Sequence, residues 1–111
     1  MATKHKTLTL TNKQITVWKH ILQKKLGWVI ESLRGTEQSD PGLWSLHIEK
    51  QFGELYFSDL ETLSELFGTK NINIENNALI DGYYDSHDHN AVLYISDIPA
   101  EVINKTTTLK E

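Results

Sequence analysis

The chain has 111 residues, of which 39% are hydrophobic and 23% charged, and this composition fits one globular domain around one core rather than a disordered segment. It contains no cysteine, which excludes a disulfide framework and thiolate metal sites, including the common zinc fingers. The polar first residues lack the apolar stretch of a signal peptide, and the longest apolar run is far shorter than the ~18 residues of a membrane span, so we expect a cytoplasmic protein with no membrane segment.

The net charge of −4 conceals a division of charge along the chain. Residues 1–34 contain seven basic residues and one acidic residue, Glu31, which gives this segment a charge of +6. Residues 35–111 contain four basic and fourteen acidic residues, which gives −10. Such a bias indicates a charged partner or two complementary faces. The seven basic residues are Lys4, Lys6, Lys13, Lys19, Lys24, Lys25 and Arg34.

A first helix is predicted over residues 12–26. Thr11 and Gln14 have the spacing of a capping box, in which each side chain satisfies a backbone donor near the other residue. Gly27 is suited to end the helix, because glycine adopts the left-handed conformation without a clash. A longer helix that continues to Leu33 remains an alternative, since the apolar spacing persists. The apolar stripe consists of Ile15, Trp18, Ile21, Leu22 and Leu26.

A region rich in β-forming residues follows Gly27. Residues 28–33 favour a strand, and residues 39–42 contain the Asp-Pro-Gly signal of a turn. Residues 43–50 alternate between apolar and polar side chains, which is typical of a half-buried strand. Residues 54–57 predict a short third strand. The alternation places Trp44, Leu46 and Ile48 on one side of the second strand, and Ser45, His47 and Glu49 on the other.

The second half of the chain begins with another helix. Ser58 and Glu61 have capping-box spacing, and Gly68 is suited to end the helix that they open. Its apolar stripe is formed by Leu60, Leu63 and Phe67. Short strands are predicted at residues 72–74, 78–84 and 91–96, the last two joined as a hairpin through the loop of residues 85–90.

These elements predict one α+β domain over residues 1–98, with the order α-βββ-α-βββ. The connections are short, which favours antiparallel neighbours in a twisted sheet, with both helices packed on one face of it. Pro99 ends the last strand, and residues 99–111 have little to bury, so we expect a frayed tail there.

One side of the first helix forms a basic stripe, which consists of Lys13, His20 and Lys24. The stripe could be an ordinary solvated face, could contact nucleic-acid phosphates, or could meet an acidic protein surface. Nucleic acid is disfavoured because the rest of the chain is strongly acidic and arginine is scarce. Homodimerisation is another reading, with the basic helix of one copy on the acidic sheet of the next.

His87 and His89 could chelate a transition metal if their segment is extended, with Asp85 or Asp81 as an oxygen ligand. The same residue types are common in hairpin loops, and a complete site needs further ligands. A metal-dependent enzyme centred on these histidines is therefore an alternative hypothesis, and a histidine pH sensor is another. No nucleophile, phosphate-loop or zinc-protease motif is present. We therefore expect a protein without catalytic activity and without a cofactor.

The leading hypothesis is a small protein-binding module, such as an inhibitor, an immunity-type protein or a regulatory partner. Acidic residues and outward-facing tyrosines in the second half of the chain provide its contact surface, because exposed aromatics beside charge are common anchors of protein interfaces. Tyr94 is a further tyrosine that alternation places outward. The predicted surface consists of Glu54, Tyr56, Asp59, Glu61, Glu65, Asp81, Tyr83, Asp85 and Asp88.

Overall fold

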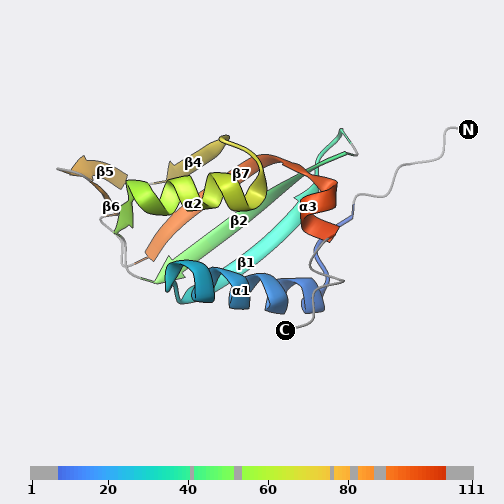
Figure 1. The fold of residues 1–111 in the computed structure, drawn as a ribbon, viewed down its shortest axis with the longest axis horizontal. Coiled ribbons are helices and arrows are strands. Elements are labelled where there is room, and N and C mark those ends of the chain that lie inside the picture. The colour runs from blue at the N-terminus through green and yellow to red at the C-terminus, as the bar shows by residue number, and fades with distance from the viewer. Residues whose placement is uncertain are drawn as a thin grey trace, which may run out of the picture.

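Groups of antiparallel strands separate the helices along the described part of the chain (Figure 1). The computed structural model describes residues 8–40, 42–51, 54–75, 77–80, 83–86 and 90–104. Within these residues, the first half contains α1 (Asn12–Leu26), β1 (Ile30–Glu37), β2 (Leu43–Gln51) and β3 (Leu55–Tyr56). The second half contains α2 (Phe57–Phe67), β4 (Ile72–Glu75), β5 (Asn77–Ile80), β6 (Tyr83–Ser86), β7 (Asn90–Pro99) and α3 (Ala100–Asn104).

The ends of α1 are fixed by side chains and backbone close in sequence. The Gln14 backbone N–H donates to Thr11 Oγ1 over 3.1 Å, and the Thr11 N–H donates to Gln14 Oε1 over 2.9 Å. Gly27 ends the helix with φ of 72°. The predicted helix over residues 12–26 is thus confirmed. The longer alternative to Leu33 is wrong, because β1 has already begun at Ile30.

The larger sheet has the strand order β1-β2-β7-β4, and every neighbouring pair is antiparallel. Strand β2 is central and is hydrogen-bonded along both sides. The residues before α1 add to the free edge of β1: the Leu10 N–H donates to the Gly35 carbonyl over 3.0 Å, and the Glu37 N–H donates to the Leu8 carbonyl over 2.8 Å. The segment before α1 thereby lies beside β1, about 25 residues later in the sequence.

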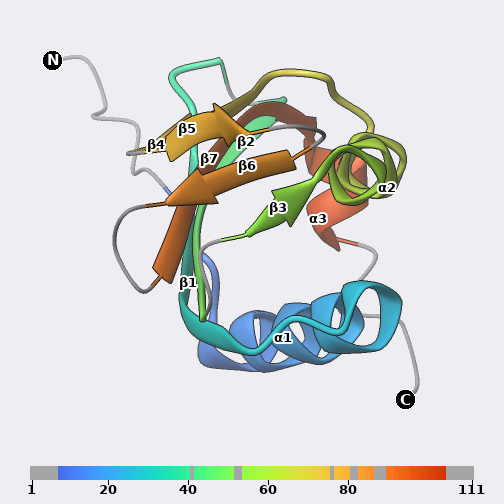
Figure 2. The same cartoon turned by 90° about the vertical axis from the view of Figure 1, so that its left-hand side faces the viewer.

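A smaller sheet with the order β3-β6-β5 lies at one end of the molecule, facing the viewer in Figure 2. The predicted hairpin between residues 78–84 and 91–96 is not formed. Strand β6 pairs with β5 and β3, whereas β7 pairs with β2 and β4. The region predicted as one strand is divided between β5 and β6, and the sequence between them is Asp81-Gly82, a dipeptide that favours a two-residue reversal.

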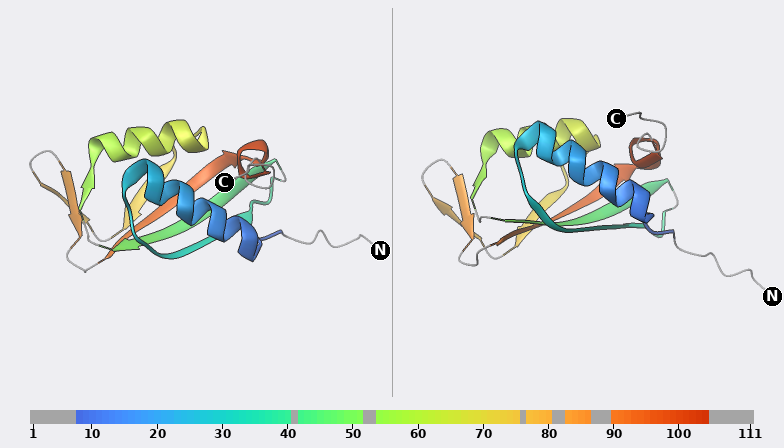
Figure 3. Two further views of the ribbon diagram at one scale, coloured as in Figure 1. Left: turned by 60° about the horizontal axis from the view of Figure 1, so that its bottom comes forward. Right: turned by 90° about the horizontal axis from the view of Figure 1, so that it is seen from below.

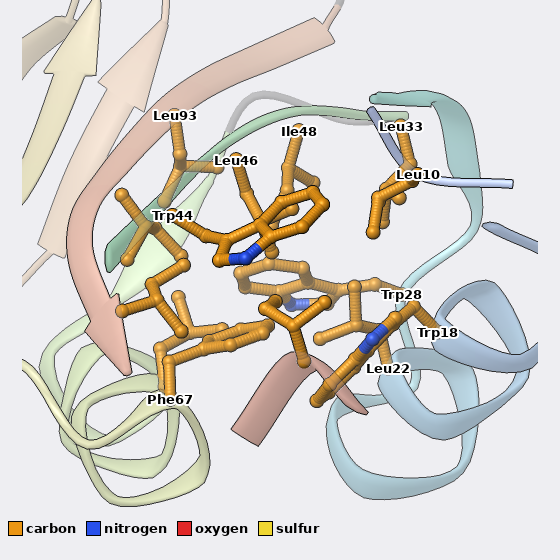
Figure 4. Packing of buried hydrophobic residues seen from close by; sticks show 14 of the residues in the cluster. Leu10, Trp18, Leu22, Trp28, Leu33, Trp44, Leu46, Ile48, Phe67 and Leu93 are labelled. Carbon is orange, nitrogen blue, oxygen red and sulfur yellow. The ribbon is translucent and has the colours of Figure 1, made fainter. Parts of the chain in front are cut away.

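Helices α1 and α2 lie on the same side of the larger sheet, with α3 near one end of it (Figure 3). The core fills the space between these layers, and the aromatic rings of Trp18 and Phe67 join the two long helices at a centroid distance of 4.8 Å (Figure 4). Strands β2 and β7 contribute their inward side chains. The most deeply buried large side chains are Leu22, Leu46, Ile48, Leu55, Leu63, Phe67, Leu93, Ile95, Ile98 and Ile103.

The start of α2 differs from the prediction. The helix begins at Phe57, one residue before Ser58, which was expected to cap it. The carboxylate of Asp59 accepts the backbone N–H of Tyr56 over 3.2 Å, so the acidic side chain that satisfies the helix start lies two residues earlier than Glu61. Gly68 ends the helix as expected, with φ of 68°.

The structure confirms a single compact α+β domain with an antiparallel sheet. The order of elements has one more strand than predicted after α2, because the run of residues 78–84 is divided. It also has a short helix where a frayed tail was expected. Ile103 of α3 is fully buried, and the Ala100 N–H donates to the Gly42 carbonyl over 2.9 Å, so this turn is part of the packed domain. Residues 105–111 lie outside the described residues.

Among the described residues, every helix is too short or too polar to cross a membrane.

Candidate functional site

Two large aromatic side chains project from the junction of β3 and α2. Strand β3 is only two residues long, so alternation buries Leu55 completely and turns Tyr56 outward, with 51% of Tyr56 exposed. Phe57 then begins α2 and is 47% exposed. The two exposed rings add to the apolar area that this part of the surface presents to water.

The neighbouring strand adds a third ring to this junction. Tyr83 of β6 lies directly opposite Tyr56 in the antiparallel register. The two rings have a centroid distance of 5.6 Å and an interplanar angle of 38°, which is a favourable tilted arrangement. Tyr83 is half-buried, so it supports the Tyr56 ring from one side and leaves the other side accessible.

Carboxylates surround this aromatic group. Glu54 precedes β3 and is exposed. Glu61 and Glu65 follow Phe57 at intervals of four residues, so the three side chains form one exposed ridge along α2. Asp59 is half-buried and engaged at the helix start, so it contributes charge more than contact area. Tyr56, Phe57, Tyr83 and the carboxylates Glu54, Asp59, Glu61 and Glu65 are called the acidic aromatic surface below.

A shallow depression of about 500 Å³ lies in the protein surface beside this ridge of α2. It is lined by Leu60, Glu61, Ser64, Glu65 and Lys70. The depression therefore combines the apolar side chain of Leu60 with the carboxylates of Glu61 and Glu65, all within two turns of α2.

Lys50 anchors the chain beneath this surface. It is 5% exposed, and its Nζ donates to the carbonyls of Gln51 over 3.1 Å and Glu54 over 3.0 Å. The same ammonium group lies 5.4 Å from the centroid of the Trp28 ring. Burial lowers the pKa of Lys50, and the nearby carboxylates of Asp59 and Glu54 oppose that shift. Lys50 thus links Gln51, at the end of β2, to Glu54, directly before β3.

The structure brings together part of the predicted surface. Glu54, Tyr56, Asp59 and Tyr83 meet at the β3–α2 junction, and Glu61 and Glu65 continue along α2. The backbone of Asp85 lies in β6 opposite Ala78, and its side chain is outside the described residues, as are Asp81 and Asp88. The sequence predicts Phe57 as the last residue of a short strand, so the predicted surface does not include it. The sequence feature that could have identified Phe57 is its position directly before the predicted second helix.

The basic stripe of Lys13, His20 and Lys24 is exposed on α1. In the described part of the chain, none of its side chains forms a hydrogen bond or an ion pair. Exposure fits a solvated face and also leaves the stripe open to a partner. His87 and His89 lie outside the described residues, and no group of three or more histidine, aspartate or glutamate side chains within those residues could hold a metal ion.

A second cluster of functional side chains crosses the larger sheet, formed by Arg34, His47 and Tyr94. The register places Arg34 and Tyr94 on either side of His47. Arg34 Nε donates to His47 Nδ1 over 2.9 Å, and the His47 and Tyr94 rings stack with centroids 4.6 Å apart and planes inclined by 12°. Alternation predicted that His47 and Tyr94 face outward, but only the strand pairing shows that they are neighbours. We call this set the Arg34–His47–Tyr94 row.

Comparison of the chain with protein-family models, curated proteins and solved structures found no match. Function is therefore inferred from the surfaces themselves. The acidic aromatic surface and the Arg34–His47–Tyr94 row differ in chemistry, since the first combines exposed apolar rings with negative charge and the second contains a single cationic group in a small hollow.

Proposed function

We propose that this protein is a non-catalytic protein-binding module, and that its acidic aromatic surface engages a partner with a basic, partly apolar surface. An inhibitor, an immunity-type protein and a regulatory subunit are the kinds of protein that work in this way. The observation that carries the proposal is the adjacent exposure of Tyr56 and Phe57, supported by Tyr83 and bordered by carboxylates.

The chemistry of the surface suits an interface. Full burial of one large apolar side chain contributes about 1.5–3 kcal/mol, so Tyr56 and Phe57 together could anchor a complex. Tyrosine also has few rotatable bonds and retains a polar hydroxyl, which makes it a frequent hot-spot residue. The carboxylates at the border contribute mainly to the rate of association, because they attract a basic partner over a distance.

The partner is found by site-specific crosslinking. A photoreactive amino acid replaces Tyr56 in the full chain, and the crosslinked protein from the native host is identified and purified. The same photoreactive group at exposed Glu101 on α3 provides the matched control, since Glu101 lies on another element. Crosslinking from position 56 and not from position 101 is the expected result. Equal products from both positions would argue against this surface.

Binding of the purified partner is then measured directly. Reversal of Glu54, Glu61 and Glu65 to lysine should slow association by about tenfold or more at low salt, with a smaller effect at high salt. Tyr56→Ala with Phe57→Ala should instead accelerate dissociation, because short-range packing is lost. Glu101→Lys serves as the charge control. A wild-type association rate in the triple variant would contradict the role given to the carboxylates.

A further inference from the structure

The outer side of the larger sheet carries its own polar chemistry. Side chains of β2 alternate, so Ser45, His47 and Glu49 point away from the core. Among the described residues, no helix covers this side of the sheet (Figures 2 and 3). Arg34 of β1 and Tyr94 of β7 are the direct cross-strand neighbours of His47. The Arg34–His47–Tyr94 row therefore lies on an open face.

The hydrogen bond within the row determines the form of the histidine. Because His47 Nδ1 accepts from Arg34 Nε, the neutral ring carries its proton on Nε2, which makes Nε2 a hydrogen-bond donor. Burial and the positive charge of Arg34 lower the pKa of His47 below 6.5, and the carboxylates of Glu49 and Glu75 oppose this shift. The ring is therefore neutral at pH 7, and Arg34 supplies the positive charge of the row.

That positive charge has no carboxylate partner among the described residues. The nearby acidic side chains bind amides instead: Glu31 Oε2 accepts from Gln51 Nε2 over 2.6 Å, and Glu49 Oε2 accepts from Asn90 Nδ2 over 2.8 Å. Arg34 is hydrogen-bonded to a neutral ring through Nε alone, so the two terminal nitrogens of its guanidinium group have no partner within the described part of the chain. A planar pair of charged donors is thus presented to the outside.

The row borders a depression of about 230 Å³. Gly35, Thr36, Ser45 and Leu46 also line it. Ligand pockets for drug-sized molecules span about 300–1,000 Å³, so this hollow fits a smaller group. Tyr94, 39% exposed, also lines the hollow, on the other side of His47 from Arg34.

We propose that this depression binds a small aromatic monocarboxylic acid. The carboxylate pairs with the terminal nitrogens of Arg34 in the bidentate geometry that arginine favours, and the aromatic body packs toward the Tyr94 ring. One positive charge matches one carboxylate. A doubly charged phosphate group would be left partly uncompensated, and Glu49 and Glu75 would repel it more strongly than they repel a single carboxylate.

The test is an NMR titration of the intact, isotope-labelled protein with benzoate. Saturable shifts are expected at Arg34 Nε–H, the His47 ring and the Tyr94 ring, and the spectrum of the unliganded protein should show His47 protonated on Nε2. Benzamide, which has the same shape without the charge, should cause no saturable shift. Arg34→Gln should weaken benzoate binding by about tenfold or more, as expected for the loss of a charged hydrogen-bond pair.

Control variants and other ligands distinguish binding at the Arg34–His47–Tyr94 row from binding elsewhere on the protein. Lys13→Gln removes a positive charge from α1 and should leave benzoate binding unchanged. Tyr94→Ala should weaken benzoate but not acetate, because acetate has no ring to pack. Shifts that do not saturate, or an equal loss in Lys13→Gln, would overturn the proposal. Tighter binding of inorganic phosphate would assign the site to phosphate instead, and tighter binding of a glutamate-containing peptide would assign it to a protein partner. Either result would reject the small acid.

Discussion

At the scale of single residues, Asp97 shows how strain and hydrogen bonding combine. It has φ of 62° at a bulge where β7 contains one residue more than β2 between paired positions. Its carboxylate accepts from Asn71 Nδ2 over 2.8 Å and from Gln38 Nε2 over 3.2 Å. These hydrogen bonds, first from Asn71 and then from Gln38, lower the pKa of Asp97 from its ordinary 3.8. The charged form is therefore favoured in the folded protein.

Asp97→Asn tests this balance through pH. Because the folded pKa is below the unfolded value, the stabilisation by Asp97 is present above pH 3.8 and is lost as the pH falls through the lower folded pKa. Asparagine tolerates the same positive φ and does not titrate. Urea unfolding of the two proteins should show a difference in stability at pH 6 that shrinks in acid. A difference independent of pH would mean that the charge has no role.

At the scale of elements, Gly35 sets how closely β1 approaches its neighbours. A Cβ atom at this position would collide with the Leu46 side chain and lie 2.9 Å from Leu10. The Leu10 and Leu46 side chains thus pack against the bare backbone of β1 at Gly35, and a larger residue there would force them to move.

Gly35→Ala should lower the free energy of unfolding by about 1–3 kcal/mol, the usual cost of an extra methyl group in a packed core. Gly42→Ala is the matched control, since the nearest atom to its added Cβ is Asp40 Oδ1 at 3.9 Å. The free energy of unfolding of Gly42→Ala should be nearly that of the wild type. Chemical denaturation of both variants provides the measurement, and an equal loss from both would point to a backbone effect in place of the collision.

Elements with local signals could be predicted from the sequence, and those that depend on distant pairing could not. The capping box at Thr11 and the glycine at residue 27 act within one helix turn, so α1 was predicted with its true ends. The division of β5 from β6 depends on which strands pair, and two runs of β-forming residues with a loop between them were equally compatible with a hairpin to β7. The same limit applies to the sites. Tyr56 and Tyr83 could be predicted to face outward, but their contact could not.

At the scale of the whole molecule, the two long helices are joined by aromatic packing over the sheet. Phe67 of α2 is fully buried and its ring lies against Trp18 of α1. Charge also differs between these helices, since α1 carries the basic stripe and α2 carries the exposed carboxylates of Glu61 and Glu65. Two neighbouring helices on one side of the sheet therefore carry charges of opposite sign (Figure 3).

Phe67→Ala should lower the free energy of unfolding by about 3–5 kcal/mol, because a cavity opens between both helices and the sheet. This is a large part of the about 5–15 kcal/mol that stabilises a typical domain. Leu66→Ala, at a half-buried neighbouring position, should cost clearly less. Urea denaturation followed by tryptophan fluorescence gives both values. A cost no greater than that of Leu66→Ala would show that the ring contact with Trp18 contributes little.

The central position of β2 has a consequence for how this protein could change over evolution. Its inward residues Trp44, Leu46 and Ile48 build the core, while the residues between them assemble the row around His47. A shift of β2 by one residue would exchange the two sets, so the core and the outer hollow would be lost together. Variants that insert or delete a residue in β2 would therefore be removed for misfolding before ligand binding could be selected. Changes in ligand preference are left to substitutions at Arg34, His47 and Tyr94 themselves.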